Sequence, residues 1–265
     1  LTNRQLKEVK QITKYFDGLA RPLQTVIRQG SMKTNNSGID MVMPIVYDKY
    51  VREQYKYLPF AANNTGGNSS LTDGYFKLNP FQQDSTFTKT EFSDETWFYA
   101  QTNFEPSPLN RITESFAPGN NWVGTSGQSN ENNRRSLKTK YWINTLTDSV
   151  RIWNVANVAN TFGTYATSAM YGTGLLSKVI AIDEHGKQTI EFKDKENKII
   201  LKKVQLIAAV DDGNGKGHYG WLCTYYIYDD FGQLRCVVQP KGVELLAAGS
   251  WSFTNAILNE QTFRY

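Results

Sequence analysis

Short apolar runs, separated by turn residues, occur along most of the chain. The clearest lies at residues 224–238, where aromatic and β-branched residues precede a turn at residues 229–232 and apolar residues resume after it. Such residues suit a pleated, half-buried surface, so this stretch predicts a β-hairpin. In its turn, Asp229 can accept hydrogen bonds from backbone amides two or three residues on, and Gly232 can take a positive φ without steric cost.

A loose version of this pattern recurs: an aromatic or aliphatic residue, an acid, two further residues, a small residue and a basic residue. The other copies are residues 15–21, 46–52, 181–187 and 192–198. One hairpin is marginal in water, so the repetition predicts a sheet built from successive hairpins. The predicted structural turn residues are Asp17, Asp48, Asp183, Gly186, Asp194, Asp229 and Gly232.

Three copies depart from the pattern at the small residue. Ala20 and Val51 stand where glycine is expected, and Asn197 replaces another glycine. Asparagine tolerates the left-handed conformation, whereas alanine and valine tolerate it poorly. We therefore expect the turns of Ala20 and Val51 to have a different geometry.

The remaining patterns complete a prediction of the fold. Residues 137–155 predict a second hairpin, with a turn at residues 144–149, and residues 243–248 and 255–263 have the apolar spacing of short helices. Polar residues predict flexible loops at 61–72 and 119–136. The expected fold is mainly β: an antiparallel strip of hairpins that forms part of a curved β shell, with short helices near the C-terminal end.

Composition narrows the classes of protein. The 265 residues are 40% hydrophobic and 13% aromatic, enough for a core, so general disorder is not expected. The 29 basic and 25 acidic residues are interspersed, which does not favour a nucleic-acid partner. A mean hydropathy of −0.50 and the lack of a long apolar run predict no transmembrane helix. The first and last residues resemble the interior of a protein, so we interpret residues 1–265 as a single module from a longer chain.

Cysteine and histidine give little support for a redox or metal site. If the 224–238 turn is centred at residues 230–231, Cys236 lies opposite Tyr225, with Cys223 diagonal to it; buried thiols are favoured, and a disulfide stays open. His185 and His218 have no neighbouring ligands in sequence, so neither a metal nor a cofactor is expected.

Other candidate chemistry is equally sparse. Residues 212–217 resemble a calcium loop, but Cys223 stands where an EF-hand places glutamate; an EF-hand is excluded and a looser calcium site stays open. The aspartates of the repeated pattern are better interpreted as turn caps than as paired catalytic carboxylates. With no catalytic set, an enzyme is not expected. Trp122, in a polar loop, is the best candidate for an exposed platform that stacks on a ligand.

Several stretches together carry a family resemblance. The pattern Tyr-Asp-x-x-Gly-Arg resembles the YD repeat of bacterial RHS proteins. The chain also resembles the uncharacterised N-terminal module that precedes the YD repeats in large surface proteins of Gram-negative bacteria, the RHS repeat-associated core domain proteins. The stretches that match in order are residues 15–25, 43–58, 104–119 and 220–246.

The resemblance implies a function. In RHS and related toxin-complex families, YD repeats form a hollow β cage around a variable C-terminal toxin. The chain would be a non-catalytic structural module that forms or caps such a cage in a secreted or cell-surface protein. Its expected partners are the remainder of its own chain, the enclosed toxin, and a secretion or surface-anchoring partner. The alternative is a secreted carbohydrate- or protein-binding adhesion module that uses the polar loops around Trp122.

Overall fold

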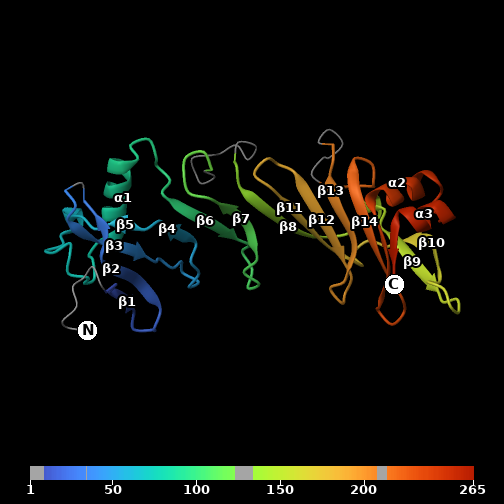
Figure 1. The fold of residues 1–265 in the computed structure, drawn as a ribbon, viewed down its shortest axis with the longest axis horizontal. Coiled ribbons are helices and arrows are strands. Elements are labelled where there is room, and N and C mark those ends of the chain that lie inside the picture. The colour runs from blue at the N-terminus through green and yellow to red at the C-terminus, as the bar shows by residue number, and fades with distance from the viewer. Residues whose placement is uncertain (1–8, 34, 123–133, 208–213) are drawn as a thin grey trace. The chain divides into compact units, whose positions relative to one another are not determined.

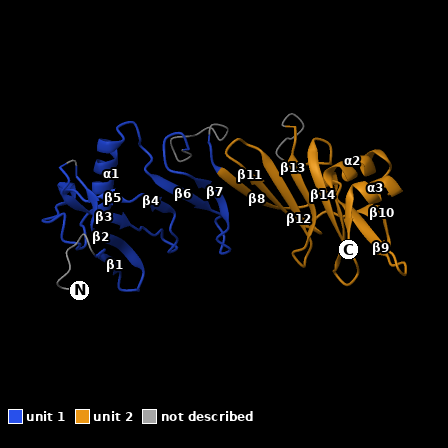
Figure 2. Cartoon of the chain, in the orientation of Figure 1, with its two compact units in different colours: residues 1–136 blue, residues 137–265 orange. Residues whose placement is uncertain are grey.

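The chain folds into two compact units, residues 1–136 and 137–265 (Figures 1 and 2). The computed structural model describes residues 9–33, 35–122, 134–207 and 214–265. That residues 1–265 form a single module of a longer chain stays a prediction. Both units are built mainly from antiparallel strands, as the sequence pattern predicts.

The described residues of the first unit contain two groups of strands, one α-helix and a short 3₁₀ helix. One antiparallel sheet has the order β1-β2-β3-β5. Its strands are β1 (Ile12–Phe16), β2 (Pro22–Met32), β3 (Gly38–Pro44) and β5 (Phe60–Ala61). In the second group, β6 lies between β4 and β7. These strands are β4 (Tyr55–Tyr57), β6 (Tyr99–Phe104) and β7 (Ile112–Phe116). A short 3₁₀ helix, η2 (Asn64–Gly66), lies inside the predicted 61–72 loop.

Helix α1 (Pro80–Glu91) of the first unit is not predicted by the apolar pattern. It begins at a proline, which suits the first helical position, but only Phe81 and Phe87 along it are large and apolar. Phe87 packs on the small core of Ile39, Val42 and Phe60. Tertiary contact, and not sequence periodicity, therefore stabilises this helix.

In the second unit, seven strands form consecutive antiparallel pairs in the order β8-β11-β12-β13-β14-β15-β16. They are β8 (Leu137–Ile143), β11 (Ser177–Ile182), β12 (Gln188–Lys193), β13 (Ile199–Gln205), β14 (Trp221–Tyr228), β15 (Leu234–Val238) and β16 (Thr262–Arg264). A separate hairpin joins β9 (Arg151–Ala156) to β10 (Thr164–Met170). Two short helices, α2 (Pro240–Ala248) and α3 (Asn255–Glu260), lie near the C-terminal end, which confirms that prediction.

The core of the second unit lies on one face of these strands. Inward residues alternate along each strand, as in the buried–exposed alternation of β14. Strand β9 and helix α2 contact β14 on this face, and Trp153 meets Tyr225 edge to face with a centroid distance of 5.8 Å. Core residues shared by the strands include Ile180, Ile190, Phe192, Leu201, Tyr225, Ile227 and Val238.

The predicted second hairpin, residues 137–155, is wrong. Strand β8 pairs with β11, and β9 pairs with β10. The reason lies in the connection, where Asn144 is fully buried and its side-chain oxygen accepts a hydrogen bond of 2.8 Å from the amide of Leu176. The Asn144 amide in turn donates to the Leu176 carbonyl. These two hydrogen bonds hold the end of β8 beside the start of β11.

The register of the 224–238 hairpin also differs from the expectation. Cys236 lies opposite Ile227, and Tyr225 lies opposite Val238. A bulge between Ile227 and Tyr228 shifts the pairing, because one strand carries an extra residue there. Both cysteines are buried free thiols, and burial raises the pKa of each to about 11.

Candidate functional site

In all five predicted turns, the aspartate holds the loop through one carboxylate oxygen. Its Oδ1 accepts hydrogen bonds from the backbone amides two and four residues further on, at N···O distances of 2.8 to 3.1 Å. The donors are Leu19 and Arg21 for Asp17, Tyr50 and Arg52 for Asp48, His185 and Lys187 for Asp183, Glu196 and Lys198 for Asp194, and Phe231 and Gln233 for Asp229.

The backbone of the five turns is also the same. The aspartate amide donates to the carbonyl four residues on, and the amide three residues on donates back to the aspartate carbonyl. The residue at this third position has a positive φ, as in a three-residue hairpin loop that ends in a left-handed bulge. The φ values are 59° at Ala20, 65° at Val51, 78° at Gly186, 66° at Asn197 and 75° at Gly232.

The prediction that Ala20 and Val51 form turns of a different geometry is therefore wrong. A left-handed conformation costs a residue with a Cβ roughly 1–2 kcal/mol. In these two turns the aspartate makes an additional contact that the sequence pattern did not reveal. The Asp17 Oδ2 atom accepts hydrogen bonds from Nε and Nη2 of Arg21, both at 2.6 Å. Asp48 Oδ2 likewise accepts from Nε and Nη2 of Arg52, both at 2.8 Å.

The carboxylates of Asp17, Asp48 and Asp229 are stabilised in their charged form. The backbone amide and the guanidinium of Arg21 hold the pKa of Asp17 below its usual value. The amide of Gln233 and the guanidinium of Arg235 do the same for the pKa of Asp229. A carboxylate that is held ionised by several donors is a weak proton acceptor, so these groups suit turn stabilisation better than acid–base chemistry.

A sixth turn in the first unit is a longer variant of the same design. The Glu105 amide donates to the Arg111 carbonyl, and Asn110 has a φ of 52°. Arg111 donates to both oxygens of Glu105, at 2.9 and 2.7 Å. Hydrogen bonds from Arg111 and Ser107 lower the pKa of Glu105 to about 2. This turn does not match the repeated pattern, because two additional residues separate its acid from its basic residue.

Neighbouring turns are joined by basic side chains that lie over aromatic rings. The guanidinium of Arg21 lies 5.4 Å from the ring centroid of Tyr47, and that of Arg52 lies 4.5 Å from the ring centroid of Phe104. Lys198 lies 5.7 Å from the ring centroid of Tyr228. In each case the ring directly precedes the acid of the next turn along that edge. The pattern's aromatic and basic positions therefore meet each other between turns, a contact that spacing within one copy cannot predict.

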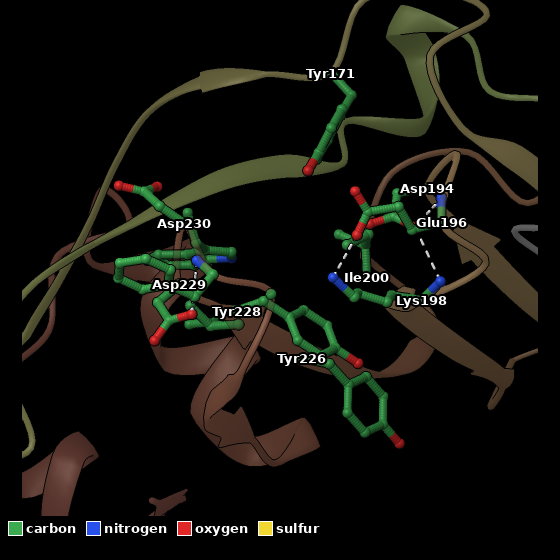
Figure 3. A pocket seen from close by; sticks show the side chains of 13 residues that line it. Tyr171, Asp194, Glu196, Lys198, Ile200, Tyr226, Tyr228, Asp229 and Asp230 are labelled. Carbon is green, nitrogen blue, oxygen red and sulfur yellow. Dashed lines mark hydrogen bonds and ion pairs between the residues drawn. The ribbon is translucent and has the colours of Figure 1, made fainter.

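A cavity of about 290 Å³ lies beside two of the turns in the second unit (Figure 3). The 194–198 turn and the 229–232 turn lie on either side of it, and Tyr171 reaches towards them with its hydroxyl end. Trp153, Ile200 and Ile227 also line the cavity. It therefore has an apolar and aromatic lining together with charged groups at the turns.

The second unit also buries charged side chains that the sequence analysis did not single out. Lys178 and Lys203 lie on the inward face of β11 and β13, and each is at least 97% buried. The Lys178 ammonium lies 2.5 Å from a carboxylate oxygen of Asp148. Lys203 donates to the backbone carbonyls of Asp148, Gly215 and Gly217, and burial lowers its pKa to about 8. The burial of both lysines could have been inferred from the sequence, because each stands two residues from a core residue and therefore lies on the same face of its strand.

His218 is partly buried, and its ring packs against the rings of Tyr225 and Trp251. Its Nε2 lies 2.9 Å from the Tyr225 hydroxyl, which also accepts a hydrogen bond of 2.9 Å from the amide of Arg151. Burial, followed by the charges of Lys203 and Arg151, lowers the pKa of His218 to about 3, so the ring is neutral at pH 7. Within the described residues, no three His, Cys, Asp or Glu side chains are grouped to hold a metal ion.

The remaining predicted sites are only partly described. The side chain of Trp122 is 39% exposed, and its amide donates to the carbonyl of Gly119. Residues 123–133 of the predicted 119–136 loop, and residues 212–213 of the calcium-like stretch, lie outside the described residues. The ligand platform at Trp122 stays a prediction. None of the helices in the described ranges is long and apolar enough to cross a membrane.

Comparisons with solved structures give distant matches. The chain is similar to part of the crystal structure of TcdB2-TccC3-Cdc42, with 14% identity and a TM-score of 0.46, over 93% of this chain and 10% of that one. It is also similar to part of a structure of the Photorhabdus luminescens Tc holotoxin pore that carries a TccC3 mutation, with 12% identity and a TM-score of 0.46, over 91% of this chain and 9% of that one. The chain spans about a tenth of the length of those chains. None of the curated proteins matches it.

The sequence of the first unit matches a known family. The family is DUF6443, described as a domain of unknown function, and the match covers residues 1–136, slightly more than half of the chain. It includes the stretches 15–25, 43–58 and 104–119, three of the four on which the predicted resemblance rests. The chain therefore belongs to the DUF6443 family.

Proposed function

We propose that this chain is a non-catalytic structural module of a large secreted or cell-surface RHS/YD-repeat protein, and that it forms or caps a β cage around a C-terminal toxin or effector. The observation that carries the proposal is the recurrence of one turn geometry in both compact units. A turn that recurs with the same hydrogen bonds suits a sheet that is extended one hairpin at a time, because each hairpin covers the strand edge that its neighbour leaves unpaired.

The contacts between turns support this role. A basic side chain of one turn lies over the ring that begins the next, at Arg21–Tyr47, Arg52–Phe104 and Lys198–Tyr228. Each hairpin is thereby fixed to its neighbour by its end as well as by its strands. The structural role of the turn residues Asp17, Asp48, Asp183, Gly186, Asp194, Asp229 and Gly232 is part of this proposal.

The proposed partners follow from this role. They are the remainder of a longer RHS/YD-repeat chain, the toxin domain that it encloses, and a secretion or surface-anchoring partner. The proposed location is outside the cell or at its surface, and no catalytic function is assigned.

Protease protection tests the proposal. The longer protein would be produced intact and with residues 1–265 deleted, and both would be treated with a protease under native conditions. We expect the C-terminal segment to resist cleavage in the intact protein and to be digested after the deletion. A longer protein with Val51→Gly serves as the matched control, because it retains the turn and should keep the protection. Equal digestion with and without residues 1–265, or a native protein that ends at Tyr265, would refute the proposed cage.

A further inference from the structure

Two turns of the first unit show how this fold holds a guanidinium group. In each, the free carboxylate oxygen of the aspartate, Oδ2, pairs with the arginine four residues on, at 2.6 Å for Asp17–Arg21 and 2.8 Å for Asp48–Arg52. The same guanidinium lies over an aromatic ring that precedes the next acid, Tyr47 in one case and Phe104 in the other. The binding position is thus defined by a carboxylate oxygen on one side and a ring on the other.

The turn at residues 194–198 has the same parts but a lysine in place of the arginine. The Lys198 ammonium pairs with Glu196 at 2.5 Å, and not with Asp194. Asp194 Oδ1 accepts the amides of Glu196 and Lys198, as in the other turns. Within the described part of the chain, no side chain donates to Asp194 Oδ2. The carboxylate oxygen that holds a guanidinium in the sister turns is therefore unpaired here.

The 290 Å³ cavity lies beside this unpaired oxygen (Figure 3). Asp194, Tyr171 and Tyr228 all line it, so the carboxylate and the aromatic ring of the sister turns are both present, and the Lys198 ammonium lies 5.7 Å from the Tyr228 ring centroid. Burial, followed by the charge of Asp194, raises the pKa of Tyr171. The volume is at the lower end of the roughly 300–1,000 Å³ typical of small-molecule pockets, so it suits one side chain and not a large ligand.

The charges around the cavity select for a cation. Four carboxylates line it, Asp194, Glu196, Asp229 and Asp230, together with the single ammonium of Lys198. Of these, Glu196 is paired with Lys198, and Asp229 is paired with Arg235 at 3.2 Å. Asp194 and Asp230 leave an excess of negative charge, which disfavours phosphate or carboxylate ligands.

We propose that this cavity binds an arginine side chain of a partner polypeptide, whose guanidinium pairs with Asp194 Oδ2 and takes the place of the Lys198 ammonium over the ring of Tyr228. Arginine fits better than lysine, because its planar group donates in a fixed fork and stacks on rings, as Arg21 and Arg52 do in this chain. This binding site goes beyond the proposed structural role and does not depend on it.

Binding of a small arginine probe tests the inference. N-acetyl-L-arginine amide would be titrated into the full 265-residue chain and followed by the NMR signals of the tyrosine rings. The lysine and citrulline analogues serve as controls, the first for charge and the second for shape without charge. We expect saturable shifts with the arginine probe and at least tenfold weaker binding of both analogues. Equal responses to the three probes, or no saturable response to arginine, would overturn the proposal.

Two variants assign the effect to the cavity. Asp194→Asn keeps the oxygen that caps the turn but removes the charge, and should weaken the arginine probe at least tenfold. Asp183→Asn makes the same change in a turn that does not line the cavity, and should leave binding unchanged. Lys198→Arg should fill the position from within the chain, so that probe binding is lost while the melting temperature is kept or raised. Undiminished binding by Asp194→Asn or Lys198→Arg would refute the site.

Discussion

The guanidinium of Arg52 lies 4.5 Å from the ring centroid of Phe104, although the two residues belong to different turns of the chain. The same guanidinium pairs with Asp48 within its own turn and donates to the Asn110 side chain of the next, at 3.1 Å. Arg52 therefore connects the two turns by two contacts, one with the Phe104 ring and one with the Asn110 side chain. The aromatic and basic positions of the repeated pattern have a shared role, which is to hold one hairpin end against the next.

A double-mutant cycle on Arg52 and Phe104 measures this connection. We expect Arg52→Gln and Phe104→Leu each to lower the free energy of unfolding, with a coupling energy between them of about 0.5–1 kcal/mol, since a partly exposed cation–ring contact is worth that much. The measurement is urea unfolding of the two single variants and the double variant. Lys195→Gln, in a turn of the other unit, is the control and should change little. Additive effects within error would show that the ring contact does not stabilise the fold.

Substitution of the two residues with unfavourable backbone conformations should stabilise the protein. Val51 and Ala20 have φ values of 65° and 59°, and glycine adopts this region without a steric penalty. We expect Val51→Gly and Ala20→Gly to raise the free energy of unfolding by about 1 kcal/mol, and Val51→Gly to have the larger effect because valine is β-branched. Val51 is 53% exposed, so little apolar burial is lost.

The control for this prediction is a change of the same chemistry at an ordinary position. Val158 is 48% exposed and does not have a positive φ. Val158→Gly should lower the melting temperature, because glycine there adds only unfolded-state entropy. If Val51→Gly raises the stability and Val158→Gly lowers it, the gain in stability at residue 51 comes from the backbone conformation. Destabilisation by Val51→Gly would contradict the strain argument.

The sequence predicted the local structure of the turns better than the contacts around them. Asp229 and Gly232 suffice to indicate a turn, because the carboxylate and the glycine act within five residues. The same local reasoning failed for Val51, whose unfavourable φ is offset by an aspartate with four donors and by contacts with another turn. A residue propensity is a weak guide wherever side-chain contacts determine the backbone.

Long-range contacts also explain the elements that were missed. The predicted 137–155 hairpin fails because Asn144 bonds to Leu176, a residue that no pattern near 144 could indicate. Helix α1 was not expected because its apolar face is carried by Phe81 and Phe87 alone. The candidate site depends on Asp194, Tyr171 and Tyr228, which come from three separate segments. Periodicity within one segment cannot predict such a meeting.

Glycine at position 232 should be required for two separable reasons. Its φ is 75°, and a Cβ at this position would overlap the Lys198 ammonium of the neighbouring turn. Gly186 has a φ of 78°, but a Cβ there meets no atom within 4 Å. We expect Gly232→Val to lower the free energy of unfolding by roughly 1 kcal/mol or more, and by more than Gly186→Val, which reports the backbone strain alone. Thermal unfolding of both variants gives the comparison, and equal losses would show that Lys198 moves aside freely.

Asp84 on α1 should make the stability of the protein depend on pH. The residue is 1% exposed, Oδ1 accepts a long hydrogen bond of 3.3 Å from Thr88, and Oδ2 is buried without a hydrogen-bond partner in the described structure. Burial raises the pKa of Asp84 to about 7 from its ordinary value of 3.8. The folded protein therefore binds this proton more tightly than the unfolded chain does, and the stability from Asp84 falls as the pH rises from about 4 to 7.

Asp84→Asn removes the proton equilibrium while it keeps the shape of the side chain. We expect this variant to gain stability relative to the wild type as the pH is raised from 5 to 8, by at most about 4 kcal/mol, since each unit of pKa shift corresponds to about 1.4 kcal/mol. Urea unfolding at several pH values between 4 and 8 measures the difference. Asp94→Asn, an exposed carboxyl in the same unit, is the matched control and should show a nearly constant difference over this range. A pH-independent difference for Asp84→Asn would mean that the carboxyl is ionised throughout, because α1 then opens to water or because a cation reaches Oδ2.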